Sequence, residues 1–270
     1  MPVLQLGSSQ FKVIYFMRLL SKQQIDDFYN IGYIFLKDFF STPEVAEMSE
    51  AINSLQEMAK DLEGEVMHKG SKFVIQDGLL ERVVWAGAAE PSLLMYGRDP
   101  KLTSLAAQIL DSMFAEHLIN QVHFKLPGGG FYRWHQDSTH RGYGNNEYWC
   151  DANGKGSYVQ TVTAIDEATS ENGPLFVIPY SCQKGHLSLP YDKNGQTVSD
   201  KFNPADAVPV LMKPGDIVAF GPYTIHGSEI NNSDRPRRAF INGYAHLGAN
   251  GKEYPGPKTH IERFVRLVGF

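Results

Sequence analysis

The segment 122–137, VHFKLPGGGFYRWHQD, joins a strand, a turn and the start of a second strand. Apolar and polar residues alternate over Val122–Leu126, which is the pattern of a β-strand with one buried face. Pro127 and the three glycines at 128–130 end that strand in a turn. Because side chains two apart in a strand point to the same face, His135 and Asp137 present an imidazole and a carboxylate together. The segment therefore predicts a β-fold that carries a pair of metal ligands.

A second histidine segment, His226-Gly227-Ser228, follows the turn Gly215-Asp216 and an apolar strand. His226 can therefore face the first pair across a barrel. Two histidines and one carboxylate on one face of a metal, with the other positions open, form the ligand set of non-haem Fe(II) oxygenases. Arg237 can grip a carboxylate through two hydrogen bonds, which suits 2-oxoglutarate. Strand alternation puts Arg238 on the opposite face, so we expect Arg237 inside the barrel and Arg238 in a surface or ion-pair contact.

The composition is that of an enzyme-sized globular chain. Its 270 residues are 42% hydrophobic, enough to bury a large core, and we expect one domain over residues 1–270. The net charge is −5 without a long basic run, so nucleic acid is not an expected partner. The only cysteines, Cys150 and Cys182, make no disulfide framework and suit free thiols in a cytoplasmic protein.

The apolar stretch 11–20 near the start of the chain contains Lys12 and Arg18. It is too short to span a bilayer, so we expect no membrane insertion. We interpret it as a terminal strand, or as an extension that precedes a start at Met17.

The order of the predicted elements indicates a mainly β fold with flanking helices. In the mainly helical part, about residues 20–115, Ser21 and Ser41 are placed to cap two helices, with a short strand between them at 33–36. Strands and turns dominate the rest, which predicts an antiparallel barrel or double-sheet jelly roll over about residues 118–247. The remaining expected elements are a helix at 102–114, strands at 158–165, 175–178, 208–212 and 216–220, and long loops at 138–157 and 183–207 near the barrel mouth.

Taken together, these segments resemble the phytanoyl-CoA dioxygenase family over roughly residues 20–247. The resemblance implies a double-stranded β-helix of cupin-like jelly-roll type, with Fe(II), the cosubstrate 2-oxoglutarate and O2. It also implies hydroxylation of an unactivated carbon in a small-molecule substrate, with release of succinate and CO2. The matching segments are His135-Gln136-Asp137, Asn172-Gly173-Pro174-Leu175 with Pro179, Gly215-Asp216 with Phe220, and His226-Gly227-Ser228 with Asn231, Ser233, Arg237 and Arg238.

The same resemblance implies roles for particular residues. His135, Asp137 and His226 match the iron ligands, and Arg237 matches the arginine that binds the distal carboxylate of 2-oxoglutarate. Some relatives replace the carboxylate ligand by a small residue and bind halide there. The presence of Asp137 therefore favours hydroxylation over halogenation.

Further cosubstrate contacts are expected from Gln121, Ser228 and Thr163. Several relatives carry a tryptophan where this chain has Val162. Gln160 or Thr163 is expected to supply a polar contact on that side of the pocket instead.

Several alternatives remain open. Arg133 shares the face of His135 in a regular strand, and either holds an acidic substrate group or forms an internal ion pair. Lys125 is another candidate for a substrate contact. The fold also suits a non-catalytic jelly-roll protein that binds a metal or ligand, or a zinc hydrolase with the same three ligands. We expect a monomer or weak homo-oligomer acting on a small molecule of unspecified identity.

Overall fold

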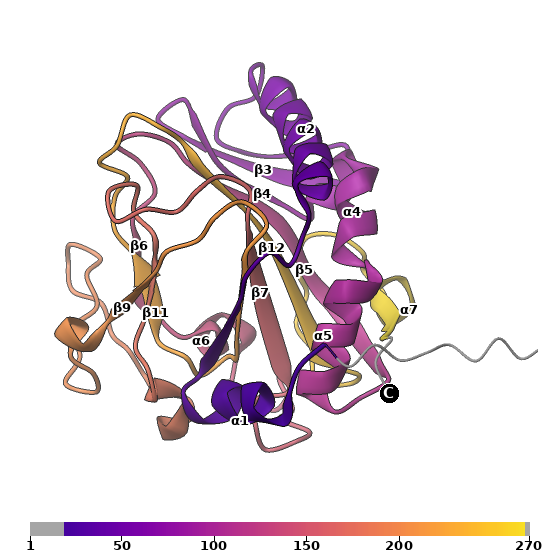
Figure 1. Ribbon diagram of the computed structural model, residues 1–270, viewed down its shortest axis with the longest axis vertical. Coiled ribbons are helices and arrows are strands. Elements are labelled where there is room, and N and C mark those ends of the chain that lie inside the picture. The colour runs from indigo at the N-terminus through magenta and orange to yellow at the C-terminus, as the bar shows by residue number, and fades with distance from the viewer. Residues whose placement is uncertain (1–18, 268–270) are drawn as a thin grey trace, which may run out of the picture.

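Two antiparallel β-sheets form the centre of the protein (Figure 1). The computed structural model describes residues 19–267. Because the alternation of side chains follows the pairing register, the sheets decide which residues face the interior. The larger sheet has the order β1 (Tyr33–Leu36), β10 (Ile217–Phe220), β7 (Tyr158–Ala164), β12 (Arg237–His246), β5 (Phe114–Lys125), β4 (Leu79–Val84), β3 (Ser71–Gln76) and β2 (Glu65–His68), with β13 (Phe264–Arg266) also paired to β5.

The smaller sheet carries the two histidine segments. Its order is β6 (Tyr132–His135), β11 (His226–Ser228), β8 (Leu175–Val177) and β9 (Val208–Val210). Val177 and Val210 of this sheet pack in one buried cluster with Val218 and Ile241 of the larger sheet. The two sheets therefore face each other across a shared interior, and the predicted jelly-roll fold is confirmed.

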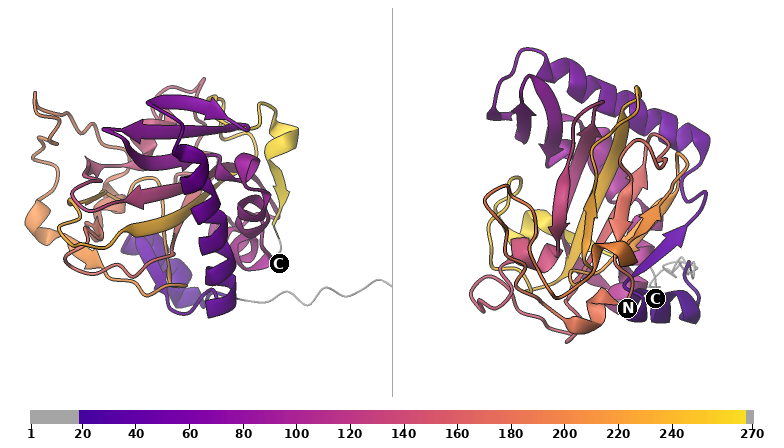
Figure 2. Two further views of the ribbon diagram at one scale, coloured as in Figure 1. Left: turned by 90° about the horizontal axis from the view of Figure 1, so that it is seen from above. Right: turned by 90° about the vertical axis from the view of Figure 1, so that its left-hand side faces the viewer.

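Helices cover the outer face of the larger sheet (Figures 1 and 2). Ile52 of α2, Leu93 of α4 and Leu105 of α5 are fully buried in a cluster that includes Val159 of β7 and Phe240 of β12. This apolar layer supports the sheet from behind. The helices are α1 (Lys22–Asn30), α2 (Thr42–Ala59), α3 (Ala86–Ala89), α4 (Pro91–Gly97), α5 (Pro100–Leu110), α6 (Asp137–Arg141) and α7 (His260–Arg263), with short 3-10 turns η1 (Ser181–Lys184) and η2 (Pro204–Asp206).

The predicted helix starts are confirmed, and one predicted helix end is wrong. Ser21 and Ser41 each form a capping box at the start of α1 and α2. The helix expected to run to residue 114 ends at Leu110, because Asp111 adopts a left-handed conformation with φ 50°. The chain then enters β5 at Phe114, four residues before the expected start of the β core.

The first third of the chain contains more strand than the sequence predicts. The strands β2, β3 and β4 extend the larger sheet beyond β5. β4 pairs with β5 through Arg82↔His123 and Val84↔Gln121, so this hairpin lies beside the segment that leads to His135.

Two predictions concern the ends and the thiols of the chain. The strand or extension expected at 11–20 lies largely outside the described residues, as does the start considered at Met17. Cys150 and Cys182 are free thiols, as expected. Within residues 19–267, no helix combines the length and the apolar character needed to cross a membrane.

Candidate metal and cosubstrate site

Three side chains from the smaller sheet and the helix after it converge at one point. His135 ends β6, Asp137 begins α6, and His226 begins β11 directly opposite His135 in the ladder. One ligand atom from each lies within 4.8 Å of the others. Asp137 Oδ1 is 3.9 Å from His135 Nε2 and 3.8 Å from His226 Nε2. The structure thus brings together the three residues that the sequence predicts as metal ligands.

The local backbone at Asp137 differs from the regular strand that the sequence predicts. β6 ends at His135, and Asp137 is the first residue of α6. Gln136 between them is extended, with φ −112° and ψ 142°, so the two flanking side chains still point to the same side. The Gln136 amide donates to the carbonyl oxygens of Gly185 and Tyr223, at 2.9 and 2.6 Å, which holds this bend in place.

Both histidines are held with Nε2 toward the carboxylate. His135 Nδ1 is 2.7 Å from the Arg133 carbonyl oxygen, and His226 Nδ1 is 2.9 Å from that of Thr224. Because a carbonyl oxygen only accepts, each Nδ1 must carry the proton, and in the neutral ring Nε2 keeps its lone pair. Burial, and to a smaller extent the neighbouring His135, lowers the pKa of His226 to about 4. The His226 ring is therefore neutral near pH 7.

The carboxylate at the centre of this cluster is buried and ionised. Burial alone would raise the pKa of Asp137, but the neighbouring His226 and Arg141 outweigh it and hold the pKa below its usual value. Asp137 Oδ2 has no hydrogen-bond partner among the described residues. The Nε2 atoms of two imidazole rings thus face one carboxylate oxygen. This donor set fits a divalent transition-metal cation.

Two buried basic side chains lie further along the barrel interior. Arg237, at the start of β12, is opposite Lys125, at the end of β5. Among residues 19–267 neither side chain forms an ion pair, and Arg237 Nε is buried without a hydrogen-bond partner. Burial lowers the pKa of Arg237 to about 10. Burial, and to a smaller extent the charge of Arg237, lowers the pKa of Lys125 to about 6. Since buried like charges repel, this arrangement favours an anionic ligand.

Lys125 also connects three parts of the site. Its Nζ donates to Ser228 Oγ at 2.7 Å and to the carbonyl oxygens of Gly173 and Glu229, at 3.0 and 2.6 Å. These bonds use all three donors of an ammonium group. Because Ser228 accepts from Lys125, its own hydroxyl proton is free to point toward a ligand.

The other expected cosubstrate contacts divide into those inside the barrel and one outside it. Gln121 pairs with Ile241 and lies on the same face of β5 as Lys125, toward the interior. Thr163 pairs with Ile217 and Phe240, which pack in the cluster beneath the helices. The prediction for Thr163 is therefore wrong, since strand alternation turns its side chain away from the barrel interior.

Two further arginines near the motifs, Arg238 and Arg133, take different positions. Arg238 is bidentate to Asp166, with contacts of 2.8 and 2.7 Å, which confirms the expected ion pair. Arg133 is exposed and its guanidinium lies 4.3 Å from the centre of the Tyr191 ring. A register shift between β6 and β11 breaks the regular alternation on which its expected position depended.

Two residues near the site had no decisive signal in the sequence. Lys125 was only one of several cations close to the motifs, although it shares the alternation of Gln121 and lies opposite Arg237. No motif in the sequence marks Arg141. It ends α6, and its Nη2 lies 3.9 Å from Asp137 Oδ2. Asp137 and Arg141 are four residues apart, a spacing that brings two side chains together once the segment is helical.

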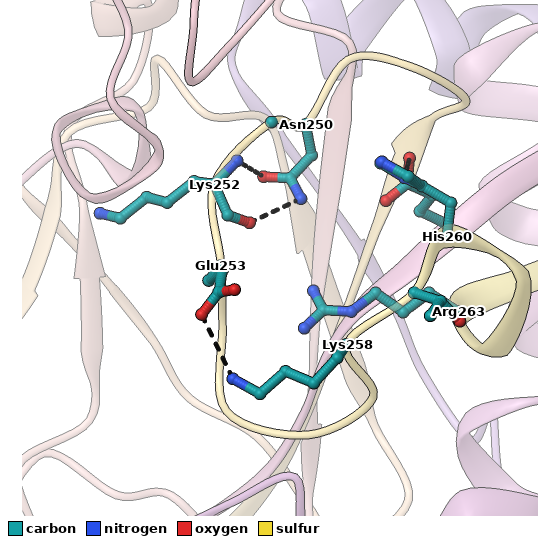
Figure 3. Close-up of a pocket in the computed structure, with 9 residues that line it drawn as sticks. Asn250, Lys252, Glu253, Lys258, His260 and Arg263 are labelled. Carbon is teal, nitrogen blue, oxygen red and sulfur yellow. Dashed lines mark hydrogen bonds and ion pairs between the residues drawn. The ribbon is translucent and has the colours of Figure 1, made fainter.

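A separate small cavity lies at the C-terminal segment (Figure 3). Its volume is about 70 Å³, and Glu116, Lys258, His260 and Arg263 are among its lining residues. Glu116 Oε2 and Arg263 Nη1 are buried there without a protein hydrogen-bond partner. None of the three candidate metal ligands lines this cavity, and bridging water suits its polar walls.

Comparisons with known proteins agree with this geometry. A family model described as phytanoyl-CoA dioxygenase (PhyH) matches residues 28–239. The chain is 29% identical to a methylphosphonate hydroxylase from Gimesia maris over 253 residues, which cover 93% of this chain and 91% of that protein. It is also 29% identical to a 2-aminoethylphosphonate dioxygenase from an uncultured bacterium, over 53% of this chain and 51% of that protein.

Solved structures of EctD from S. alaskensis share the fold. The crystal structure with bound Fe superimposes with a TM-score of 0.67 at 22% identity, covering 89% of this chain and 82% of that one. The structure with 2-oxoglutarate and 5-hydroxyectoine also gives 0.67, at 20% identity, covering 93% and 87%.

Proposed function

This chain belongs to the phytanoyl-CoA dioxygenase family, and we propose that it is an Fe(II)- and 2-oxoglutarate-dependent dioxygenase that hydroxylates a small molecule. The observation that carries this proposal is the combination of two sites in one barrel interior. A donor set for a divalent metal lies on β6, α6 and β11, and two buried basic side chains without an ionic partner among the described residues lie at the facing ends of β5 and β12. A metal-binding protein needs only the metal donors, whereas a metal enzyme with a dianionic cosubstrate also needs the basic side chains.

In this proposal His135, Asp137 and His226 are the iron ligands. The two histidines contribute Nε2, because their Nδ1 protons are engaged by backbone carbonyl oxygens. Such backbone acceptors fix the ring orientation and make the imidazole a better donor. The three protein ligands leave the other positions open for a cosubstrate and O2.

Arg237 is the proposed partner of the distal carboxylate of 2-oxoglutarate. Its guanidinium has a buried Nε without a partner, and a carboxylate accepts two parallel hydrogen bonds from such a group. Ser228 accepts a hydrogen bond from Lys125, the ladder partner of Arg237, so its own hydroxyl proton remains available to a ligand. We assign Lys125 a positioning role, with its charge adding to the attraction for a dianion, and Gln121 lines the same face.

When bound, Fe(II) and 2-oxoglutarate supply the activation of O2, with one oxygen atom transferred to the substrate and the keto acid converted to succinate and CO2. The chain contributes a dry and ordered site. The ring of Phe220 has its centre 4.6 Å from that of His226, and Phe220 is buried in one apolar cluster with Val162 and Val218. An apolar wall of this kind excludes water from a reactive centre.

The two alternatives account for fewer of these observations. A zinc hydrolase or a non-catalytic binding protein explains the three metal donors, but gives no reason to bury Arg237 and Lys125 next to each other without an acidic partner among the described residues. Burying two basic groups side by side destabilises a protein unless an anionic ligand offsets the cost, and the lowered pKa of Lys125 reflects that cost.

The substrate is proposed to be a small molecule of the kind that the relatives' names indicate. The two curated relatives reported above are a methylphosphonate hydroxylase and a 2-aminoethylphosphonate dioxygenase. We therefore propose a small phosphonate ahead of a CoA thioester. The free thiols of Cys150 and Cys182 suit the cytoplasmic location expected from the sequence.

Turnover of 2-oxoglutarate tests this function. Iron-loaded protein is expected to convert 2-oxoglutarate to succinate and CO2 in air, and ¹⁸O from ¹⁸O2 should enter both succinate and the hydroxylated product. Asp137→Ala should lose this turnover, whereas Arg133→Gln, which removes an exposed cation from the same segment, should keep it. Hydrolysis by zinc-loaded protein, with no consumption of 2-oxoglutarate by the iron form, would refute the proposal.

A further inference from the structure

We propose that Arg141 binds the anionic head group of the substrate, and that this head group is a phosphonate bonded directly to the carbon that is hydroxylated. The inference rests on the proposed function and adds a subsite to it. Arg141 lies on the opposite side of Asp137 from the two histidines, in contact with the second carboxylate oxygen, Oδ2, at 3.9 Å.

Arg141 is a buried cation with unused hydrogen-bonding capacity. Its relative exposure is 4%. Among the described residues it donates two hydrogen bonds, from Nη2 to Tyr158 Oη at 2.5 Å and from Nη1 to Tyr254 Oη at 3.4 Å. Both acceptors are phenol oxygens rather than carboxylates, and Nε is buried without a hydrogen-bond partner among the described residues. Because a guanidinium group has five N–H donors, a site of this kind can accept an additional oxyanion.

Within residues 19–267 the carboxylate that pairs with Arg141 is Asp137, which already has a role in the proposed site. Asp137 Oδ1 faces the two histidines, so a bound metal draws on the negative charge of this residue. With a divalent metal, a dianionic cosubstrate and the cations Arg237, Lys125 and Arg141, the interior keeps a net positive charge. A substrate that carries negative charge beside Arg141 restores the balance, which is the condition for burying so many charges.

The position of Arg141 restricts where that negative charge can be. Its guanidinium is adjacent to a carboxylate that contacts the metal position, so an anion bound to it lies beside the metal as well. The carbon that faces the metal must then be joined to the anionic group by one bond or very few. A CoA thioester carries its phosphates far from the reacting carbon, and its charge cannot reach Arg141 from there.

The surroundings of Arg141 suit a compact tetrahedral oxyanion. Its guanidinium carbon lies 4.2 Å from the centre of the Tyr158 ring, and Tyr158 Oη donates onward to Gln160 Oε1 at 2.8 Å. Gln160 faces the barrel interior on the same strand as Val162. The Tyr158 proton is used by Gln160, so the donors left for a ligand are the free guanidinium N–H groups of Arg141 and the amide N–H groups of Gln160. Donors from two different groups match the three oxygens of a phosphonate better than the planar pair of a carboxylate.

The C-terminal segment holds Arg141 in place. Lys252 Nζ donates to the His140 carbonyl oxygen at 2.7 Å, directly before Arg141. Arg263 donates to the carbonyl oxygen of Tyr254 at 2.9 Å, and Figure 3 shows its guanidinium group in the centre of the small cavity there. This segment lies beyond residues 28–239, so the subsite uses parts of the chain outside the region that the family model matches.

The test is a titration of methylphosphonate into anaerobic protein loaded with Fe(II) and 2-oxoglutarate, followed by the change in the visible charge-transfer band. The wild-type protein and Arg133→Gln should respond with equal affinity. In Arg141→Gln the apparent Kd for methylphosphonate should rise at least about thirtyfold, the lower range for losing one partner of a buried charge pair. Arg141→Lys keeps a charge and should fall between the two. The affinity for 2-oxoglutarate should change less than about threefold in both variants, since Arg141 does not contact the proposed cosubstrate site.

Each outcome separates the subsite from the general function. A wild-type protein that binds 2-oxoglutarate but does not respond to methylphosphonate or 2-aminoethylphosphonate would overturn the phosphonate subsite and leave the oxygenase intact. An equal response to acetate would overturn the preference for phosphonate. Equal losses of iron, 2-oxoglutarate and methylphosphonate binding in Arg141→Lys would show that Arg141 only supports Asp137. Failure of the wild-type protein to bind 2-oxoglutarate at all would refute the proposed function itself.

Discussion

Replacing Lys125 by methionine should weaken 2-oxoglutarate binding and remove its pH dependence. The substitution keeps an unbranched side chain but removes the cation beside Arg237 and the hydrogen bond to Ser228 Oγ. A hydrogen bond to a charged group contributes about 1.5–3 kcal/mol, so the Kd for 2-oxoglutarate should rise about tenfold to 150-fold.

The pH dependence follows from the pKa of Lys125, about 6 in the empty site. A bound dianion raises that pKa, so the protein takes up a proton when the cosubstrate binds. The affinity is therefore greatest below pH 6 and falls as the pH rises, by up to about tenfold per pH unit. Between pH 6.5 and 8.5 the wild-type Kd should increase by up to about two orders of magnitude.

Titration of 2-oxoglutarate into anaerobic Fe(II)-loaded protein at pH 6.5, 7.5 and 8.5 measures both effects. Ser228→Ala is the matched control, because it removes the hydroxyl group and keeps the cation. It should bind more weakly than the wild type but retain the same pH dependence. Two results together would refute this reasoning: a wild-type Kd that is constant over this range, and a Lys125→Met Kd within about threefold of it.

Three further predictions concern other residues. Arg237→Ala should raise the Kd for 2-oxoglutarate at least about thirtyfold with little change in melting temperature, as measured by the same titration and by calorimetry. Arg238→Ala breaks the bidentate pair with Asp166 and should lower the free energy of unfolding by about 1–3 kcal/mol while leaving 2-oxoglutarate binding unchanged; the reverse pattern would contradict the assigned faces of β12. His117 is fully buried, and burial, with Arg98 next, lowers its pKa to about 3. Since the unfolded histidine takes up a proton below about pH 6.5 and the folded one does not, stability is lost as the pH falls through that range, by about 2 kcal/mol between pH 7 and 5. Denaturant unfolding measures this effect. Between pH 7 and 5 the free energy of unfolding of His117→Gln should fall by about 2 kcal/mol less than that of the wild type. An equal fall in both proteins would show that His117 titrates normally in the folded state.

The metal ligands and the arginine of the site could be predicted from short sequence motifs, because each role needs a particular residue type at a particular position. His135 and Asp137 remain on one side even though Asp137 begins a helix, since a single extended residue between them has the same effect as a regular strand. Arg237 and Arg238 separate as expected because alternation along β12 is regular at that point.

The errors arise where long-range register decides the outcome. Thr163 faces the helices because of its pairing with Ile217, which a single strand does not reveal. Arg133 is exposed because the ladder between β6 and β11 shifts register. Lys125 gains its role from burial and from Ser228, 103 residues away, which leaves no local pattern. Arg141 contacts Asp137 only because residues 137–141 form a helix, and the sequence predicts a loop there.

The most direct test of the central claim is the visible absorption of anaerobic Fe(II)-loaded protein on addition of 2-oxoglutarate. The account predicts a metal-to-ligand charge-transfer band in the wild-type protein and in Arg133→Gln, no band in Asp137→Ala, and a band that needs far more cosubstrate in Arg237→Ala. A wild-type protein that retains iron but shows no band at saturating 2-oxoglutarate would contradict the account.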